Sequence, residues 1–107
     1  MHYAVYVIGP KAGPFKVGRS TNVGARLIAL QNAHYEKLQI HLVSYFYDEM
    51  AHYTAEREMH QSLKACKIRG EWFSTALANI RTQLRAVSVQ TLALFDPELY
   101  KIGRAHV

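Results

Sequence analysis

Hydrophobic and polar residues alternate in the first part of the chain, which is typical of β-strands with one buried face. Residues 2–9 alternate and are rich in Tyr and Val, and residues 15–19 follow after a turn that contains two Gly-Pro pairs. We expect these two segments to pair as an antiparallel hairpin. A third strand is predicted over residues 38–47, where β-branched and aromatic side chains are frequent.

Three other segments carry hydrophobic residues at the spacing of amphipathic helices. The first follows the N-cap candidates Ser20, Thr21 and Asn22 and ends near residues 32–34. The second begins after Asp48 and runs to about residue 65. The third begins at residue 74 or 75 and ends at Asp96, because a proline follows. Its apolar positions are Leu77, Ile80, Leu84, Val87 and Leu92.

The order of these segments predicts an α+β fold with a three-stranded antiparallel sheet flanked by helices, in the order β-β-α-β-α-α. Residues 71–73 form a short extended piece before the third helix. With 107 residues the chain has room for one domain. We assign residues 1–80 to this domain and residues 81–101 to a helical extension that packs on it or leaves it.

Composition narrows the class of protein. The formal charge is +5, which favours a polyanionic partner such as nucleic acid. A single cysteine, Cys66, excludes an internal disulfide and a multi-cysteine zinc site. No apolar run reaches the roughly 20 residues of a membrane helix, and the N-terminus does not resemble a signal peptide. We therefore expect a cytoplasmic protein with no membrane partner.

The last six residues, Ile-Gly-Arg-Ala-His-Val, match one reading frame of a widely used sequencing adapter. Our hypothesis is that residues 102–107 are translated adapter and that the natural C-terminus is missing. A larger DNA-binding protein or domain that accompanies this one would then have been lost by truncation.

Five short motifs follow one another along the first two-thirds of the chain. They are Ala4-Val5-Tyr6, Lys16-Val17-Gly18, Arg19-Ser20-Thr21-Asn22 with Arg26-Leu27, Glu56-Arg57-Glu58-Met59-His60, and Arg69-Gly70-Glu71-Trp72-Phe73. In this order they resemble the GIY-YIG nuclease superfamily. The last two resemble its branch named for a phage open reading frame and a fission-yeast meiotic gene. The resemblance implies an endonuclease or nicking domain that hydrolyses DNA phosphodiester bonds with Mg²⁺ or Mn²⁺.

The resemblance also implies four catalytic residues: Tyr6, Lys16, Arg26 and Glu56. Glu56 matches the family's metal ligand, and one carboxylate with waters suits Mg²⁺. Arg26 matches the phosphate-binding arginine, and a guanidinium fork suits phosphate oxygens. Each also has an ordinary interpretation, as a solvated helix glutamate and a surface arginine.

Tyr6 matches a tyrosine that positions or deprotonates water in the family, although a cross-strand packing role is open. Lys16 stands where the family usually has tyrosine. Three roles for Lys16 are chemically sensible: accepting the proton of water, stabilising the transition state as a cation, and binding a backbone phosphate.

Six more residues are candidate nucleic-acid contacts: Gly18, Arg19, Ser20, His60, Lys67 and Arg69. Gly18 permits a close backbone approach or serves packing. His60 shares a helix face with Glu56 and is a near-site contact or a core histidine. Glu71 is the alternative metal ligand, expected to pair with Arg26 or Arg69. Trp72 and Phe73 are expected to close the core over the second helix.

Two other functions stay open at this point. One is a catalytically inactive nucleic-acid-binding domain with the same scaffold, suggested by Lys16 in place of tyrosine. The other is a basic interaction module for an acidic protein. The nuclease hypothesis makes a structural prediction that separates them: Tyr6, Lys16, Arg26 and Glu56 must converge on one concave face.

Overall fold

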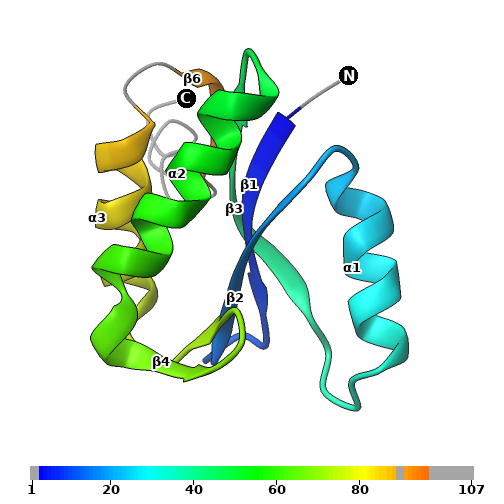
Figure 1. Ribbon diagram of the computed structural model, residues 1–107. Coiled ribbons are helices and arrows are strands. Elements are labelled where there is room, and N and C mark those ends of the chain that lie inside the picture. The colour runs from blue at the N-terminus through cyan, green and yellow to red at the C-terminus, as the bar shows by residue number, and fades with distance from the viewer. Residues whose placement is uncertain (1–2, 89–90, 97–107) are drawn as a thin grey trace, which may run out of the picture.

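The computed structural model describes residues 3–88 and 91–96, which form one antiparallel sheet with helices on both faces (Figure 1). The sheet has six strands in the order β4-β5-β2-β1-β3-β6. Along the chain they are β1 (Tyr3–Gly9), β2 (Phe15–Ser20), β3 (Gln39–Phe46), β4 (Lys67–Arg69), β5 (Trp72–Phe73) and β6 (Thr91–Phe95). The predicted hairpin and third strand are the three central strands.

The helices divide between the two faces of the sheet. Figure 1 shows α1 (Val23–Asn32) on one side and α2 (Glu49–Ser62) with α3 (Leu77–Val87) on the other. A short 3₁₀ helix, η1 (Lys64–Cys66), follows α2. Among the helices in the described part of the chain, none is long and apolar enough to cross a membrane.

Side-chain caps start the first two helices where the sequence predicted. The Asn22 side chain accepts a hydrogen bond from the Ala25 amide at 3.0 Å, and Asp48 accepts one from the Ala51 amide at 2.7 Å. Such caps satisfy amide groups that have no partner inside the helix. The start of α1 directly after β2 brings Arg26 close to the hairpin.

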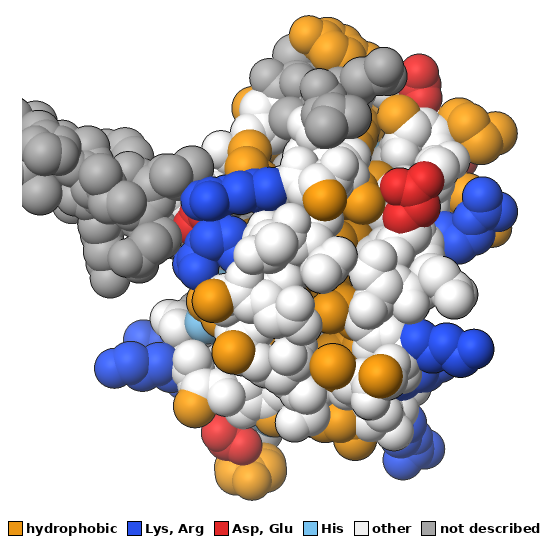
Figure 2. Space-filling view, turned by 90° about the vertical axis from the view of Figure 1, so that its left-hand side faces the viewer, with side chains coloured by type: hydrophobic (Ala, Val, Ile, Leu, Met, Phe, Trp, Pro, Cys, Tyr) orange, Lys and Arg blue, Asp and Glu red, His pale blue; other side chains and the backbone are white. Residues whose placement is uncertain are grey.

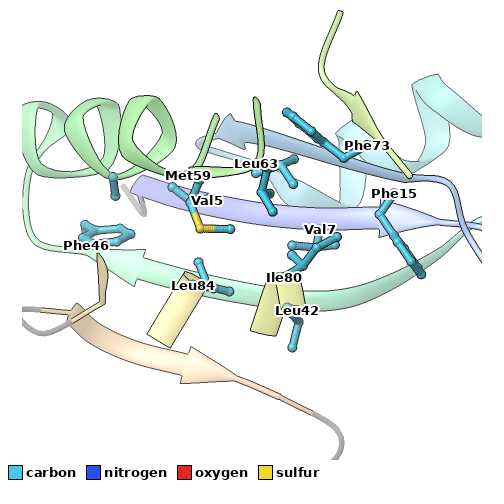
Figure 3. Packing of buried hydrophobic residues seen from close by; sticks show 12 residues of the cluster. Val5, Val7, Phe15, Leu42, Phe46, Met59, Leu63, Phe73, Ile80 and Leu84 are labelled. Carbon is cyan, nitrogen blue, oxygen red and sulfur yellow. The ribbon is translucent and has the colours of Figure 1, made fainter. Parts of the chain in front are cut away.

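The main hydrophobic cluster lies between the sheet and the α2–α3 layer (Figure 3). Every second residue of β1 and β2 points into it, including Val5, Val7 and Val17. From α2, the buried Met59 packs into it, and Leu63 follows just after the helix. The intervening strand residues point to the α1 face, where a smaller cluster includes Ala4, Tyr6, Ile8 and Val23. Tyr6 is therefore buried on the face opposite α2.

The expected number of strands was wrong. The extended piece at residues 71–73 belongs to a hairpin of β4 and β5, which pairs with β2 through Phe15↔Phe73 and Lys16↔Trp72. On the other edge, β6 pairs with β3. These strands are short, so local alternation gave little signal for them.

The third helix was also predicted too long. It ends at Val87, and Leu92, expected on the helix, belongs to β6. Asp96 does not stop a helix: its buried carboxylate lies 2.9 Å from both Arg81 Nε and Arg85 Nη2 on α3. These ion pairs fasten the end of β6 to α3.

Two expectations about the domain limits remain. The proposed division at residue 80 falls inside α3, and it stays a prediction. The interpretation of residues 102–107 as translated adapter lies outside the described residues.

Candidate active site

A pocket of about 690 Å³ is lined by residues of β1, β2, α1 and α2. All four residues predicted to be catalytic line it. The lining consists of Tyr3, Tyr6, Lys16, Arg19, Ser20, Thr21, Arg26, Leu30, Glu49, His52, Glu56 and Glu71. Residues far apart in sequence thus meet at one concave surface, as the nuclease hypothesis requires.

Strand register places Tyr6 beside Gly18. The two residues are directly paired across β1 and β2 and project from the same face. A side-chain carbon at position 18 would lie 2.6 Å from Tyr6 Cζ and 3.1 Å from Glu71 Oε1. Glycine is therefore needed for the tyrosine ring to lie across the strand, so Gly18 has a packing role whatever else it contacts.

The Tyr6 side chain is almost completely buried, and it lines the pocket. Burial and, to a smaller extent, the nearby Glu71 carboxylate raise the pKa of Tyr6 to about 12, although Arg26 acts in the opposite direction. The hydroxyl consequently keeps its proton at neutral pH. It can donate one hydrogen bond while it accepts another.

The hairpin turn between β4 and β5 brings Glu71 into the pocket. Gly70 has φ +55°, a left-handed conformation that favours glycine and allows the tight turn. The Glu71 carbonyl accepts a hydrogen bond from the Val17 amide at 2.9 Å. Its carboxylate lies 3.0 Å from Lys16 Nζ, so the partner of Glu71 is Lys16 and not Arg26 or Arg69.

Glu56 projects from α2, next to the stripe that fills the core. Its side chain is 14% exposed, and Arg19 Nε lies 3.6 Å from its Oε1. Burial raises the pKa of Glu56, and the neighbouring Glu71 carboxylate adds to this effect, while His60, Arg19 and Lys16 oppose it.

Glu56, His60 and Glu71 form a group that suits a divalent metal. One ligand atom from each lies within 4.8 Å of the other two. The His60 Nε2–H group donates to the Val17 carbonyl at 2.7 Å, which leaves the lone pair of a neutral ring on Nδ1. Two carboxylates suit Mg²⁺ or Mn²⁺, and the imidazole adds affinity for Mn²⁺. Glu56 and Glu71 are thus neighbours, whereas the sequence had suggested them as alternatives.

Arg26 lies on the first turn of α1 and lines the pocket from the opposite side. Its side chain is exposed, and within residues 3–88 and 91–96 no carboxylate lies within ion-pair distance of it. The guanidinium is therefore free to bind an anion in the pocket.

The other candidate nucleic-acid contacts divide into two sets. Arg19 and Ser20 line the pocket, and the Arg19 guanidinium also lies 4.5 Å from the centre of the Tyr53 ring. Lys67 and Arg69 are exposed on β4, outside the pocket lining. Figure 2 shows that Lys and Arg side chains also lie along both sides of the face near α3, among separate hydrophobic groups.

The sequence had not singled out His52. It is 3% exposed, lines the pocket, and neither ring nitrogen has a hydrogen-bond partner among the described residues. Burial lowers the pKa of His52, and Arg19 lowers it further, so the ring is neutral at neutral pH. Its place four residues before Glu56, on the same helix face, was the available signal.

Comparisons with curated proteins and with solved structures gave no match. A family model described as the T5orf172 domain matches residues 3–88. This range contains every strand and helix that builds the pocket, and the family name derives from a phage open reading frame, as the predicted branch does. The chain belongs to the T5orf172 domain family.

Proposed function

We propose that this protein is a metal-dependent endonuclease of the GIY-YIG type, which hydrolyses phosphodiester bonds in DNA. The observation that carries the proposal is the meeting of Tyr6, Lys16, Arg26 and Glu56 in one pocket. These residues come from four different elements, so their meeting is independent of the sequence spacing that suggested them.

The pocket can accept a phosphate because it is lined by Lys16, Arg19 and Arg26. Arg26 binds two phosphate oxygens through its fork, and no protein carboxylate has to be displaced first. Lys16 acts as a second cation on the opposite side of the pocket. Placing these donors in a partly enclosed site favours the extra charge of the transition state over that of the substrate.

Glu56 and Glu71, with His60 beside them, would hold Mg²⁺ or Mn²⁺. When bound, the ion supplies positive charge at the phosphate and at the leaving oxygen. The Val17 backbone supports this arrangement. Its amide donates a hydrogen bond to the Glu71 carbonyl, and its carbonyl accepts one from the His60 ring. Ligands oriented in this way bind metals more tightly.

Tyr6 is proposed to position the attacking water. Its protonated hydroxyl can donate to a phosphate oxygen and accept from water. In the reaction, the oxygen of water forms a bond to phosphorus, and the bond from phosphorus to the leaving deoxyribose oxygen breaks. The proton that the water loses ends on the leaving oxygen, carried there by solvent.

The test is cleavage of supercoiled plasmid DNA with Mg²⁺ or Mn²⁺. We expect nicked product from the wild type, loss of at least 100-fold in rate in Glu56→Gln and Arg26→Ala, and near-normal rate in Arg57→Ala. Arg57 is exposed on α2 and outside the pocket lining, which makes it a matched control. A wild type that is inert with both metals on supercoiled, single-stranded and branched DNA would reject the proposal.

A second function is supported by the Lys16–Glu71 ion pair, which engages Glu71 without any metal. It is a nucleic-acid-binding domain with no turnover. Salt-sensitive DNA binding without cleavage, unchanged in Glu56→Gln, is the result that would favour it.

A further inference from the structure

A row of aromatic rings leads from the pocket to the surface. Tyr35 stacks on His34 with ring centres 5.9 Å apart and an angle of 13°, and His34 stacks on Trp72 at 5.8 Å and 29°. Lys16 Nζ lies 5.8 Å from the centre of the Trp72 ring. Because Lys16 lines the pocket, the row begins where the scissile phosphate is proposed to bind.

The end of the row is open to solvent. Tyr35 is 94% exposed, so its ring adds almost nothing to the hydrophobic core. The ring Nδ1 of His34 is buried, and it has no hydrogen-bond partner in the part of the chain that the structure describes. Fold stability therefore does not explain why the Tyr35 ring is exposed beside His34.

The loop that carries the two rings is held in place by one side chain. Gln31, at the end of α1, donates from Nε2 to the carbonyl oxygens of His34 at 3.2 Å and Glu36 at 2.8 Å. Its Oε1 accepts from the Leu38 amide at 2.7 Å. The exposed Tyr35 ring and the half-buried His34 ring are thus presented by a fixed backbone, which lowers the entropy lost when a ligand binds.

We propose that Tyr35, His34 and Trp72 form a stacking surface for unpaired bases of the DNA strand whose backbone enters the pocket. Every base has a π-face that can stack on an aromatic ring, and nearby cations hold the backbone. Paired bases inside a duplex do not expose their faces. The preferred substrate is therefore DNA with a single-stranded segment next to the cleaved bond, such as a flap or a frayed end.

This inference rests on the proposed function in one respect, that the ligand is DNA. It can be tested by binding alone, without cleavage. Trp72 is the single tryptophan of the chain, so its fluorescence reports directly on the stacking surface. The experiment uses the Glu56→Gln variant in chelator, titrated with a thymidine oligonucleotide, an abasic oligonucleotide of equal length, and a blunt duplex.

We expect the thymidine oligonucleotide to quench Trp72 and to bind at least tenfold more tightly than the abasic one. Tyr35→Ala should weaken its binding by about tenfold, the size of one base–aromatic stack. Tyr35→Phe should retain it, and Tyr47→Ala, which removes another exposed tyrosine outside the pocket, should have no effect.

Equal binding of thymidine and abasic oligonucleotides, or equal losses in Tyr35→Ala and Tyr47→Ala, would overturn the stacking surface. Ring-dependent binding by a wild type that cleaves no DNA would leave the stacking surface intact and reject only the nuclease. If the wild type cleaves flap DNA and Tyr35→Ala cleaves it equally well, the nuclease proposal stands and the stacking surface is rejected.

Discussion

Tyr6 lies across Gly18, so closely that a single added carbon at position 18 would collide with the tyrosine ring. The two residues are paired across β1 and β2, and neither strand can shift without breaking the centre of the sheet. The missing side chain at position 18 therefore leaves the space that the Tyr6 ring and hydroxyl occupy beside β2.

We therefore expect Gly18→Ala to lower the cleavage rate at least tenfold and to destabilise the fold by about 1–3 kcal/mol, since Tyr6 is buried and cannot easily move. The rate of plasmid nicking and urea denaturation measure the two effects. Gly24→Ala is the control: the nearest atom to its new carbon is 3.7 Å away, on Asn22. It should leave the rate unchanged and stabilise α1 by up to about 1 kcal/mol. Equal cleavage rates in Gly18→Ala and Gly24→Ala would contradict the role of the Tyr6–Gly18 contact in the pocket.

Glu56→Gln should stabilise the metal-free protein at neutral pH. The pKa of Glu56 is raised in the folded state, so the folded protein holds this proton more readily than the unfolded chain does. The charged carboxylate thus costs stability as pH rises through the raised pKa. This loss of stability disappears when the pH is below the ordinary pKa of glutamate, because the carboxyl is then protonated in both states.

Thermal melts in chelator check this expectation. At pH 7 the Glu56→Gln melting temperature should be on the order of a few degrees above that of the wild type, and at pH 3.5 the two should converge. Mn²⁺ should raise the melting temperature of the wild type more than that of the variant. Glu58→Gln, on the exposed side of the same helix, should match the wild type throughout. A Glu56→Gln variant less stable than the wild type at pH 7 would show that the carboxylate is already well paired.

His60→Asn separates a metal role from a DNA-contact role. If His60 belongs to the metal group, the Mn²⁺ concentration for half-maximal cleavage should rise about 10- to 100-fold, with most of the rate recovered at saturating metal. Metal titrations of the nicking rate measure this. A rate that stays low at every metal concentration, with a weaker DNA affinity, would instead assign His60 to the substrate.

Arg81→Ala should destabilise the fold by about 1–3 kcal/mol, because it leaves the buried Asp96 carboxylate with fewer partners. Arg85→Ala should cost less, since the Arg85 side chain is 44% exposed and that of Arg81 is 19% exposed. Urea denaturation measures both, with Arg57→Ala as a surface control. If Arg81→Ala loses no more stability than Arg57→Ala, β6 is held only by its backbone pairing with β3.

The parts of the fold that the sequence predicted correctly are those with local causes. The alternation in β1, the β-branched and aromatic residues of β3, and the caps at Asn22 and Asp48 are all features of residues a few positions apart. The strands β4 and β5 have three and two residues, too short for an alternation signal. Leu92 continued the helical spacing of α3, yet it belongs to β6, the strand that pairs with β3.

The candidate site divides in the same way. Tyr6, Lys16, Arg26 and Glu56 were recognised as motif residues, and all four line the pocket. The partner of Glu71, expected to be Arg26 or Arg69, was predicted incorrectly, because its carboxylate meets Lys16, which lies more than fifty residues earlier in the chain. Nothing in the spacing of His34 and Trp72 indicated that their rings would stack.

The hydrogen bonds of the Val17 backbone also affect the exposed edge of the sheet. Beyond Lys16, the outer edge of β2 is no longer covered by β5, and an uncovered strand edge invites pairing with a second protein molecule. The Glu71 carbonyl and the His60 ring occupy the amide and carbonyl that Val17 would offer. Two positions further on, Arg19 brings a charge to the same edge. The groups that shape the pocket thereby also protect the sheet from aggregation through this edge.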